Sequence, residues 1–284
     1  MAKKYKIAVI GSGTMGNGIA HVCAQSGNKT LLLDINDNQL QDAISNIKNN
    51  LKRQLKKNII NQGEMNQILN NIQTTTDLNM CKDFDLIIEA IPEKFELKSS
   101  LFKELDKICN KNTVFATNTS SISISNLANQ TRRDAKFIGM HFMNPVPIMK
   151  LVEVINTLKT DSNTTNMIVD IIEGMNKVPI QCNDYPGFIS NRILMPMINE
   201  AIFCLEQNIA TKEAIDGIMK LGMAHPMGPL ELADFIGLDV CLDIMEVLCS
   251  GFNDSKYRPC PLLKKMVSSG LLGKKTGKGF YKYD

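Results

Sequence analysis

The 284-residue sequence has no tryptophan, only three histidines and no cysteine pair with CxxC spacing. It also lacks an uninterrupted run of about 18 apolar residues, so we expect no signal peptide, no membrane span and a cytoplasmic location. Its eight scattered cysteines favour reduced thiols over disulfides or a metal site. A net charge of +3 is too small to indicate nucleic-acid binding. The 44% of hydrophobic residues is enough for a substantial core.

A glycine-rich turn follows the first predicted strand, residues 7–10. In Gly11-Ser12-Gly13-Thr14-Met15-Gly16, the first glycine permits a tight turn, the second lets the backbone approach a pyrophosphate, and the third lets the next helix pack closely. A second apolar run ends in Asp34, 18 residues beyond Gly16 and near the ~20 expected for a carboxylate that binds an adenosine ribose. Glycines alone would indicate only a turn. The combination predicts a dinucleotide site that includes Gly11, Gly13, Thr14, Met15, Gly16 and Asp34.

Asp34 is followed by Ile35 and Asn36, and no arginine stands there to receive a 2′-phosphate. A carboxylate in this position repels that phosphate, so we expect NAD to be preferred over NADP.

A long amphipathic helix is predicted next, with its apolar positions running from Leu40 to Ile59. Its other faces carry five cations within ten residues, namely Lys48, Lys52, Arg53, Lys56 and Lys57. Such a pattern is typical of a solvated helix face. The alternative is a docking surface for a polyanionic part of a substrate, and the residues alone leave both interpretations open.

Two further buried strands, residues 84–88 and 114–117, each lead into a polar segment. In a doubly wound sheet, the loops at the carboxyl ends of strands line the ligand crevice. Glu93 and Lys98 after the first strand are therefore placed to meet a cofactor or substrate. The hydroxyl-rich segment 118–121 after the second strand is where a hydroxyl that orients a substrate would lie. Ordinary helix starts would also explain both segments.

A histidine and a glutamate lie on either side of a proline-rich turn. Strand alternation places Glu153 between two aliphatic residues on one face of the strand 151–155. A buried carboxylate needs a partner, and His141 ends the strand before the turn. We therefore predict that these side chains pair, which is the arrangement of a general base. His21 is expected to be a core residue and His225 a loop residue.

The pattern changes at residues 184–187. Strands alternate with helices before this point, whereas long helical periodicity dominates after it. We predict an α/β domain over residues 1–184, with a Rossmann-like, doubly wound and mostly parallel sheet, and an all-helical domain over residues 185–284 that completes the substrate cleft. The methionine-rich helices have more apolar faces than one copy could bury, which favours a homodimer.

The sequence blocks occur together in an order that resembles the short-chain L-3-hydroxyacyl-CoA dehydrogenases, and most closely the bacterial 3-hydroxybutyryl-CoA dehydrogenases. They are GSGTMG at 11–16, EAIPE at 89–93, NTSS at 118–121, HFMNPVPIMKLVEVI at 141–155, DYPGFISNRIL at 184–194, HPMGPLELADFIGLD at 225–239 and KTGKGFY at 275–281. The likeness runs nearly end to end. Met143 and Ser190 depart from the family pattern, in the region expected to shape the acyl pocket.

This resemblance implies an enzyme that interconverts a short-chain (S)-3-hydroxyacyl-CoA, such as 3-hydroxybutyryl-CoA, and the 3-oxoacyl-CoA by hydride transfer with NAD(H). It implies His141 as the base, Glu153 as the carboxylate that orients it, and Ser120 and Asn191 as substrate contacts. It also implies cofactor contacts from Asp34, Glu93, Lys98, Asn118 and Asn144, and it favours Arg53 and Lys57 of the basic helix as contacts to CoA.

Three alternatives remain open at this stage. A non-catalytic nucleotide-binding relative would keep the fold without turnover, but the set of Ser120, His141, Glu153 and Asn191 argues against it. A nucleic-acid binder would use the basic helix, but aromatic residues are not interleaved there. A dehydrogenase of a free hydroxy acid would need no docking surface for CoA. We expect a small-molecule acyl-CoA partner, with no nucleic acid and no membrane.

Overall fold

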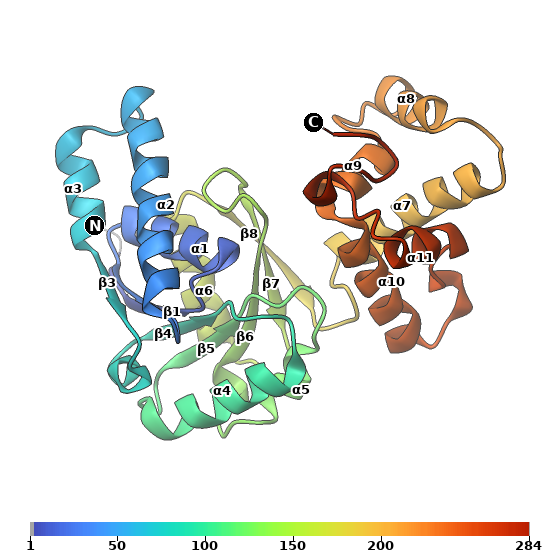
Figure 1. Ribbon diagram of the computed structural model, residues 1–284. Coiled ribbons are helices and arrows are strands. Elements are labelled where there is room, and N and C mark those ends of the chain that lie inside the picture. Colours follow the sequence, from blue (N-terminus) through green and yellow to red (C-terminus); the bar gives the residue numbers. More distant parts are fainter. Residues whose placement is uncertain (1–2, 284) are drawn as a thin grey trace. The chain divides into compact units, whose positions relative to one another are not determined.

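An eight-stranded sheet forms the centre of the first part of the chain, in a computed structural model that describes residues 3–283 (Figure 1). Its strand order is β3-β2-β1-β4-β5-β6-β7-β8. Neighbouring strands are parallel except β6 and β7, which are antiparallel. The strands are β1 (Lys6–Ile10), β2 (Lys29–Leu33), β3 (Ile72–Thr75), β4 (Leu86–Glu89), β5 (Val114–Thr117), β6 (Phe137–Phe142), β7 (Leu151–Asn156) and β8 (Val178–Asn183).

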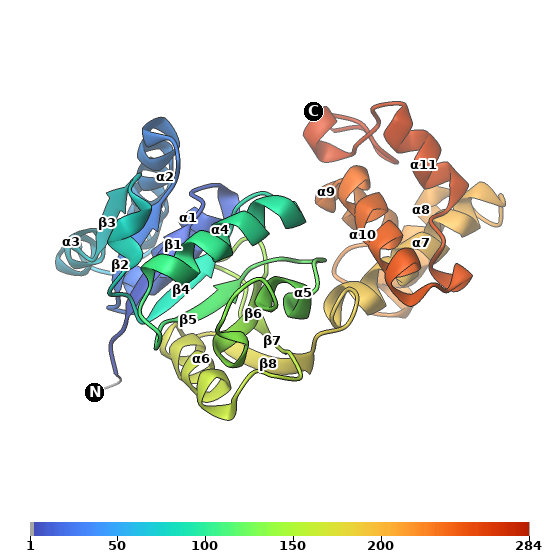
Figure 2. The same ribbon diagram turned by 90° about the horizontal axis from the view of Figure 1, so that it is seen from below.

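Helices cover both faces of this sheet (Figures 1 and 2). Alternate strand residues such as Ile7 and Val9 join one core with α1, α2, α3 and α6. On the other face, the Phe102 ring of α4 packs against the rings of Phe115 and Phe137, with centroids 5.6 and 4.7 Å away. These helices are α1 (Thr14–Gln25), α2 (Asp37–Lys56), α3 (Gln62–Asn70), α4 (Phe95–Ile108), α5 (Ile124–Ala128) and α6 (Ser162–Gly174).

β1 pairs in parallel with β2 on one side and with β4 on the other, and the strand order reverses between β1 and β4. Ligands of doubly wound sheets bind at such a reversal, outside the carboxyl ends of the strands. The predicted doubly wound, mostly parallel sheet is confirmed. The fold therefore places the glycine turn after β1 and the ends of β4, β5 and β6 along one edge.

Two elements of this region were not predicted, α3 and β3. β3 is an edge strand of only four residues, Ile72–Thr75, and its side chains are half-buried or exposed, so it has no apolar run or clean alternation. The basic helix also ends earlier than its apolar pattern, at Lys56, because Asn58 has a left-handed backbone with φ of 55°.

The remainder of the chain is helical, as predicted. The chain divides into two compact units, Met1–Asp184 and Tyr185–Asp284, and the second has its own core built around residues such as Ile202, Leu230 and Leu248. Its helices are α7 (Ser190–Glu206), α8 (Lys212–Gly222), α9 (Pro229–Ile236), α10 (Leu238–Phe252) and α11 (Pro261–Ser268).

The buried carboxylate of Asp234 in α9 holds the last segment of the second unit, residues 280–283, by hydrogen bonds. Asp234 accepts hydrogen bonds from the N–H groups of Phe280 and Tyr281, at 2.9 and 2.8 Å, and from the Tyr283 hydroxyl at 3.0 Å.

Within residues 3–283, no helix is long and apolar enough to cross a membrane.

Candidate active site

The glycine turn has the backbone geometry that its spacing predicts. Gly11 has a φ of 97°, and a Cβ there would lie 2.5 Å from the Ala90 carbonyl oxygen. A Cβ at Gly16 would lie 1.7 Å from the Gly11 oxygen, so both positions require glycine. A Cβ added at Gly13, by contrast, would meet nothing within 4 Å, and no side chain caps the start of α1 there. An open helix N-terminus of this kind suits a phosphate.

Asp34 connects the glycine turn to the end of β2 by hydrogen bonds. The residue is 8% exposed, and its Oδ2 accepts hydrogen bonds from the Ser12 N–H at 2.7 Å and the Ser12 hydroxyl at 2.8 Å. The predicted ribose carboxylate thus lies against the predicted phosphate turn. Ser12 was not identified from the sequence, because the position between the first two glycines is variable in the motif.

A buried charge cluster lies at the carboxyl end of β4. The Lys98 ammonium, 1% exposed, lies 2.5 Å from Glu89 Oε1 and 3.2 Å from Glu93 Oε2, and donates to the Ile91 carbonyl at 3.1 Å. These contacts occupy all three N–H groups of the ammonium. Lys98 therefore holds Glu93 in place from within the protein. Glu89, which completes the cluster, was missed because only the fold brings it to Lys98.

The electrostatics of the two carboxylates differ. Burial raises the pKa of Glu89 above its ordinary value, although Lys98 opposes this effect. Burial would also raise the pKa of Glu93, but the charge of Lys98 and several donated hydrogen bonds outweigh it and hold this pKa below its ordinary value. Glu93 is therefore a stable anion at the edge of the sheet.

Glu93 joins the ends of β4 and β5. Its Oε1 accepts hydrogen bonds from the Thr119 hydroxyl, from the N–H groups of Ser120 and Ser121 at 2.9 and 3.1 Å, and from the Ser121 hydroxyl at 3.0 Å. Asn118 reaches the next strand, since its Oδ1 accepts from the Phe142 N–H at 2.9 Å. The structure therefore brings Glu93, Asn118 and Ser120 together beside the end of β6.

His141 and Glu153 are directly opposite residues of the antiparallel pair β6 and β7. Opposite residues share one face of a sheet, and His141 Nδ1 lies 2.7 Å from Glu153 Oε2. Both residues are buried, with 8% and 3% exposure. The two side chains paired in the sequence analysis are in contact. If the imidazole is neutral, this contact places the proton on Nδ1 and leaves Nε2 as an acceptor.

The remaining predicted residues lie at several places. Thr14 and Met15 begin α1, Asn144 is exposed in the turn after β6, and Asn191 is in the first turn of α7, in the second unit. His21 is fully buried in α1, as expected of a core histidine, and burial lowers its pKa to about 4.

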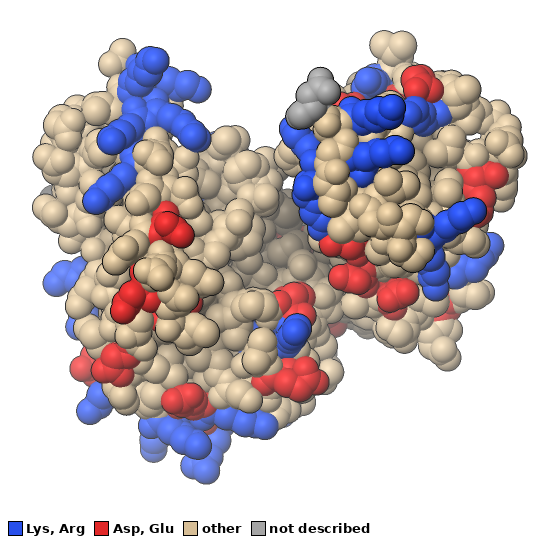
Figure 3. Space-filling model, viewed as in Figure 1, with Lys and Arg blue, Asp and Glu red and all other residues tan. Residues whose placement is uncertain are grey.

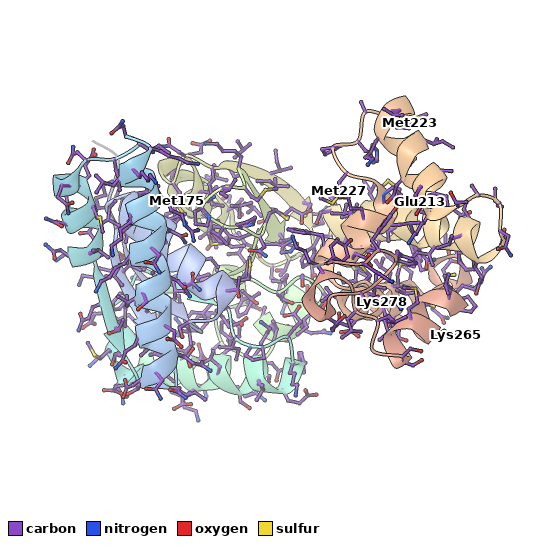
Figure 4. All side chains as sticks on the ribbon, turned by 45° about the horizontal axis from the view of Figure 1, so that its top comes forward. Met175, Glu213, Met223, Met227, Lys265 and Lys278 are labelled. Atoms are coloured by element: carbon purple, nitrogen blue, oxygen red, sulfur yellow. The ribbon has the colours of Figure 1, made fainter. Side chains whose placement is uncertain are left out.

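Basic side chains gather over α2 (Figure 3), and two of them, Arg53 and Lys57, line a cavity of about 530 Å³ in the first unit. Met175, which lies beside α2, also lines it (Figure 4). Lys150 and Lys177 bring the cations to four, and no carboxylate is among the lining residues. This part of the first unit is therefore suited to an anion.

Comparison with known proteins covers almost the whole chain. Residues 6–185 match the family described as 3-hydroxyacyl-CoA dehydrogenase, NAD binding domain, and residues 187–283 match 3-hydroxyacyl-CoA dehydrogenase, C-terminal domain.

Within residues 3–283, no group of three or more histidine, cysteine, aspartate or glutamate side chains could hold a metal ion.

Individual relatives agree with these matches. The chain is 53% identical to a probable 3-hydroxybutyryl-CoA dehydrogenase of Deinococcus radiodurans, over 98% of this chain and 100% of that protein. It is 50% identical to a probable 3-hydroxybutyryl-CoA dehydrogenase of Bacillus subtilis, over 98% and 97%. The crystal structure of the (S)-3-hydroxybutyryl-CoA dehydrogenase of Ralstonia eutropha superposes with a TM-score of 0.97 at 44% identity, covering 99% and 100%. The chain belongs to the NAD-dependent 3-hydroxyacyl-CoA dehydrogenase family.

Proposed function

We propose that this enzyme interconverts (S)-3-hydroxybutyryl-CoA and acetoacetyl-CoA with NAD(H). The observation that carries the proposal is the buried contact of His141 with Glu153, at 2.7 Å, at the end of β6. β1 and β6 point the same way in the parallel part of the sheet, so the end of β6 shares its edge with the glycine turn. An acid–base group and a dinucleotide cradle thus occur on one edge.

In this proposal the histidine moves the proton. During oxidation, neutral His141 accepts the proton of the 3-hydroxyl group at Nε2, while the Nδ1 proton stays hydrogen-bonded to Glu153. During reduction, protonated His141 returns that proton to the oxygen on carbon 3. The cofactor, when bound, supplies or accepts the hydride. Glu153 fixes the ring and stabilises the imidazolium.

Other residues orient the reactants. The turn from Gly11 to Gly16, with Thr14 and Met15 at the start of α1, would bind the pyrophosphate, and Asp34 the adenosine ribose. Glu93, held by Lys98, together with Asn118 and Asn144, would contact the nicotinamide half of the cofactor. Ser120 and Asn191 would donate hydrogen bonds to the substrate oxygens and so keep carbon 3 in position.

The cationic cavity supports a CoA ester over a free hydroxy acid. CoA carries a pyrophosphate and a 3′-phosphate, and charge-assisted hydrogen bonds from Arg53 and Lys57 would bind such groups. A free hydroxy acid has a single carboxylate and no phosphate groups, so the cations of the cavity would have nothing to bind. We therefore assign the two residues as CoA contacts.

The rate of NADH oxidation tests this function. It is measured as the fall in NADH absorbance over time at a fixed enzyme concentration. We expect turnover with acetoacetyl-CoA and little with acetoacetate, and weaker turnover with NADPH. The series of longer 3-oxoacyl-CoA esters then gives the chain-length range. Activity on acetoacetate without activity on the CoA ester would replace this proposal with the free-acid alternative.

We also propose that the enzyme is a homodimer formed through its second unit. Large apolar side chains are exposed on this unit, and several lie on or next to α8, where Met223 follows the last turn (Figure 4). They include Ile209, Ile218, Leu221 and Met223, which are 61% to 92% exposed. A patch of this kind is typical of a subunit contact. Sedimentation equilibrium should give twice the chain mass, and a monomer at micromolar concentration would refute this.

A further inference from the structure

The turn between β6 and β7, residues 143–150, connects the strand of His141 to the strand of Glu153 and contains Asn144. Part of this turn is folded on itself, since the N–H groups of Ile148 and Met149 both donate to the Pro145 carbonyl at 3.0 Å. Those bonds set the local shape of the turn. They do not set its place on the rest of the unit.

Two contacts from outside the turn hold its middle, around Val146, whereas its end is fixed separately by the Val178 N–H, which donates to the Lys150 carbonyl at 2.8 Å. Lys177 donates from Nζ to the Val146 carbonyl at 2.5 Å and to the Met149 carbonyl at 2.6 Å. The second contact comes from α1, which approaches so closely that a Cβ on Gly18 would lie 2.8 Å from the Val146 Cβ. The turn is thus seated on the helix that begins at the glycine turn, and Lys177 fixes it there.

The ammonium of Lys177 is in an unusual environment for a charge. The residue is 7% exposed, and no ion pair joins it to a carboxylate in the described part of the chain. Burial lowers its pKa from the ordinary value, and repulsion from Lys150 adds to this. A buried charge is costly unless hydrogen bonds satisfy it, and here the two turn carbonyls do so.

The way in which α6 ends determines the position of Lys177. Asn176 has a left-handed backbone with φ of 56°, and the Lys177 N–H donates to the Ile172 carbonyl at 3.2 Å. Asparagine tolerates this conformation well, so the helix stops there and the chain reverses into β8. The reversal places Lys177 next to the turn instead of continuing the helix into solvent.

We propose that Lys177 is a positioning residue for the reaction, because it holds the turn that presents Asn144 to the cofactor. This inference rests on the proposed function, in which Asn144 contacts the nicotinamide half of NAD(H). His141 is held separately by the pairing of β6 with β7. Removing the Lys177 ammonium should therefore disturb cofactor binding and hydride transfer, while the proton chemistry of the histidine continues.

Lys177→Met tests this, since methionine keeps a long side chain and removes the ammonium. We expect the KM for NADH to rise about tenfold and kcat to fall about 10- to 100-fold, because a misplacement of about 1 Å can cost ~10² in rate. The shape of the pH profile of kcat should not change. Lys150→Met is the matched control, since Lys150 lines the same cavity but is the last residue of the turn, six residues beyond Asn144, and its Nζ donates to the Asn176 carbonyl at 3.2 Å.

The control separates two roles for Lys177. A rise in the KM for acetoacetyl-CoA that both variants share reports the lost cavity charge. A rise in the KM for NADH should be confined to Lys177→Met. If Lys177→Met instead changes only the KM for acetoacetyl-CoA, the residue is a substrate contact and the positioning role is refuted.

Gly18→Ala provides a second approach if the lysine variant does not fold. The added methyl presses on Val146 from α1 without removing a buried hydrogen bond, and alanine suits the helix. We expect the same rise in the KM for NADH and a smaller fall in kcat. Wild-type values in a folded Gly18→Ala or Lys177→Met protein would overturn the inference. A wild type inactive on acetoacetyl-CoA would refute the proposed function instead, and fluorescence titration with NADH would still compare the variants.

Discussion

Replacing Glu153 by glutamine would test the histidine–carboxylate pair with little change in shape. The side chain keeps its size and its place opposite His141 in the β6–β7 ladder, but it loses its charge. The wild-type contact is 2.7 Å long and both partners are buried, so solvent would screen the pair only weakly. The variant therefore removes a charge–charge contact at the point where the reaction creates or consumes an imidazolium.

The size of the effect has two parts. A hydrogen bond to a charged group contributes about 1.5–3 kcal/mol, which corresponds to roughly 10- to 150-fold in rate. The amide NH₂ of glutamine can also donate to Nδ1, which moves the imidazole proton to Nε2 and leaves no acceptor for the substrate. The corresponding change in serine proteases costs ~10⁴ in kcat. We expect a fall in kcat of about 10²- to 10⁴-fold for Glu153→Gln.

The assay is reduction of NAD with saturating (S)-3-hydroxybutyryl-CoA, the direction in which His141 accepts the proton, together with the dissociation constant for NADH from fluorescence titration. The first should fall by the stated factor, and the second should stay within about twofold, because Glu153 acts on the proton and not on cofactor binding. A folded Glu153→Gln enzyme with more than about half the wild-type kcat would refute the role given to this carboxylate.

Three further predictions concern the cofactor, the substrate and the core. Asp34→Ala should reduce the preference for NADH over NADPH at least tenfold, measured as the ratio of the two kcat/KM values, because the 2′-phosphate is no longer repelled. Arg53→Ala with Lys57→Ala should raise the KM for acetoacetyl-CoA by ~10-fold or more with kcat nearly unchanged, whereas Lys52→Ala, outside the cavity lining, should not. His21 is neutral in the folded protein, with its pKa lowered to about 4, so its contribution to stability is present above pH 6.5 and is lost as the pH falls toward 4. His21→Leu should remove about 2 kcal/mol of the stability loss between pH 6.5 and 4.5, measured by urea unfolding, and an unchanged loss would contradict its burial as a neutral side chain.

Much of the site follows from local patterns. The glycine turn can be predicted because Gly11 and Gly16 each meet a backbone constraint that excludes any other residue. The pairing of His141 with Glu153 is readable because two strands joined by a short turn place opposite residues on one face, and alternation identifies which residue faces inward.

Other parts depend on contacts that no local pattern encodes. The cluster of Glu89, Glu93 and Lys98 combines a strand end, a loop and the following helix, and only the packed fold shows that Lys98 faces inward. Lys177 was missed for the same reason, since its partners Val146 and Met149 are 31 and 28 residues away. The strand β3 was missed because an exposed edge strand needs no apolar run.

The measurement that tests the central claim most directly is the turnover of His141→Ala with NADH and acetoacetyl-CoA, with NADH binding measured on the same protein. We predict that kcat falls by at least ~10²-fold, because general acid–base catalysis supplies about 10²–10⁴ of the rate, and that the dissociation constant for NADH stays within about twofold. Turnover near that of the wild type in a folded His141→Ala enzyme would contradict the account.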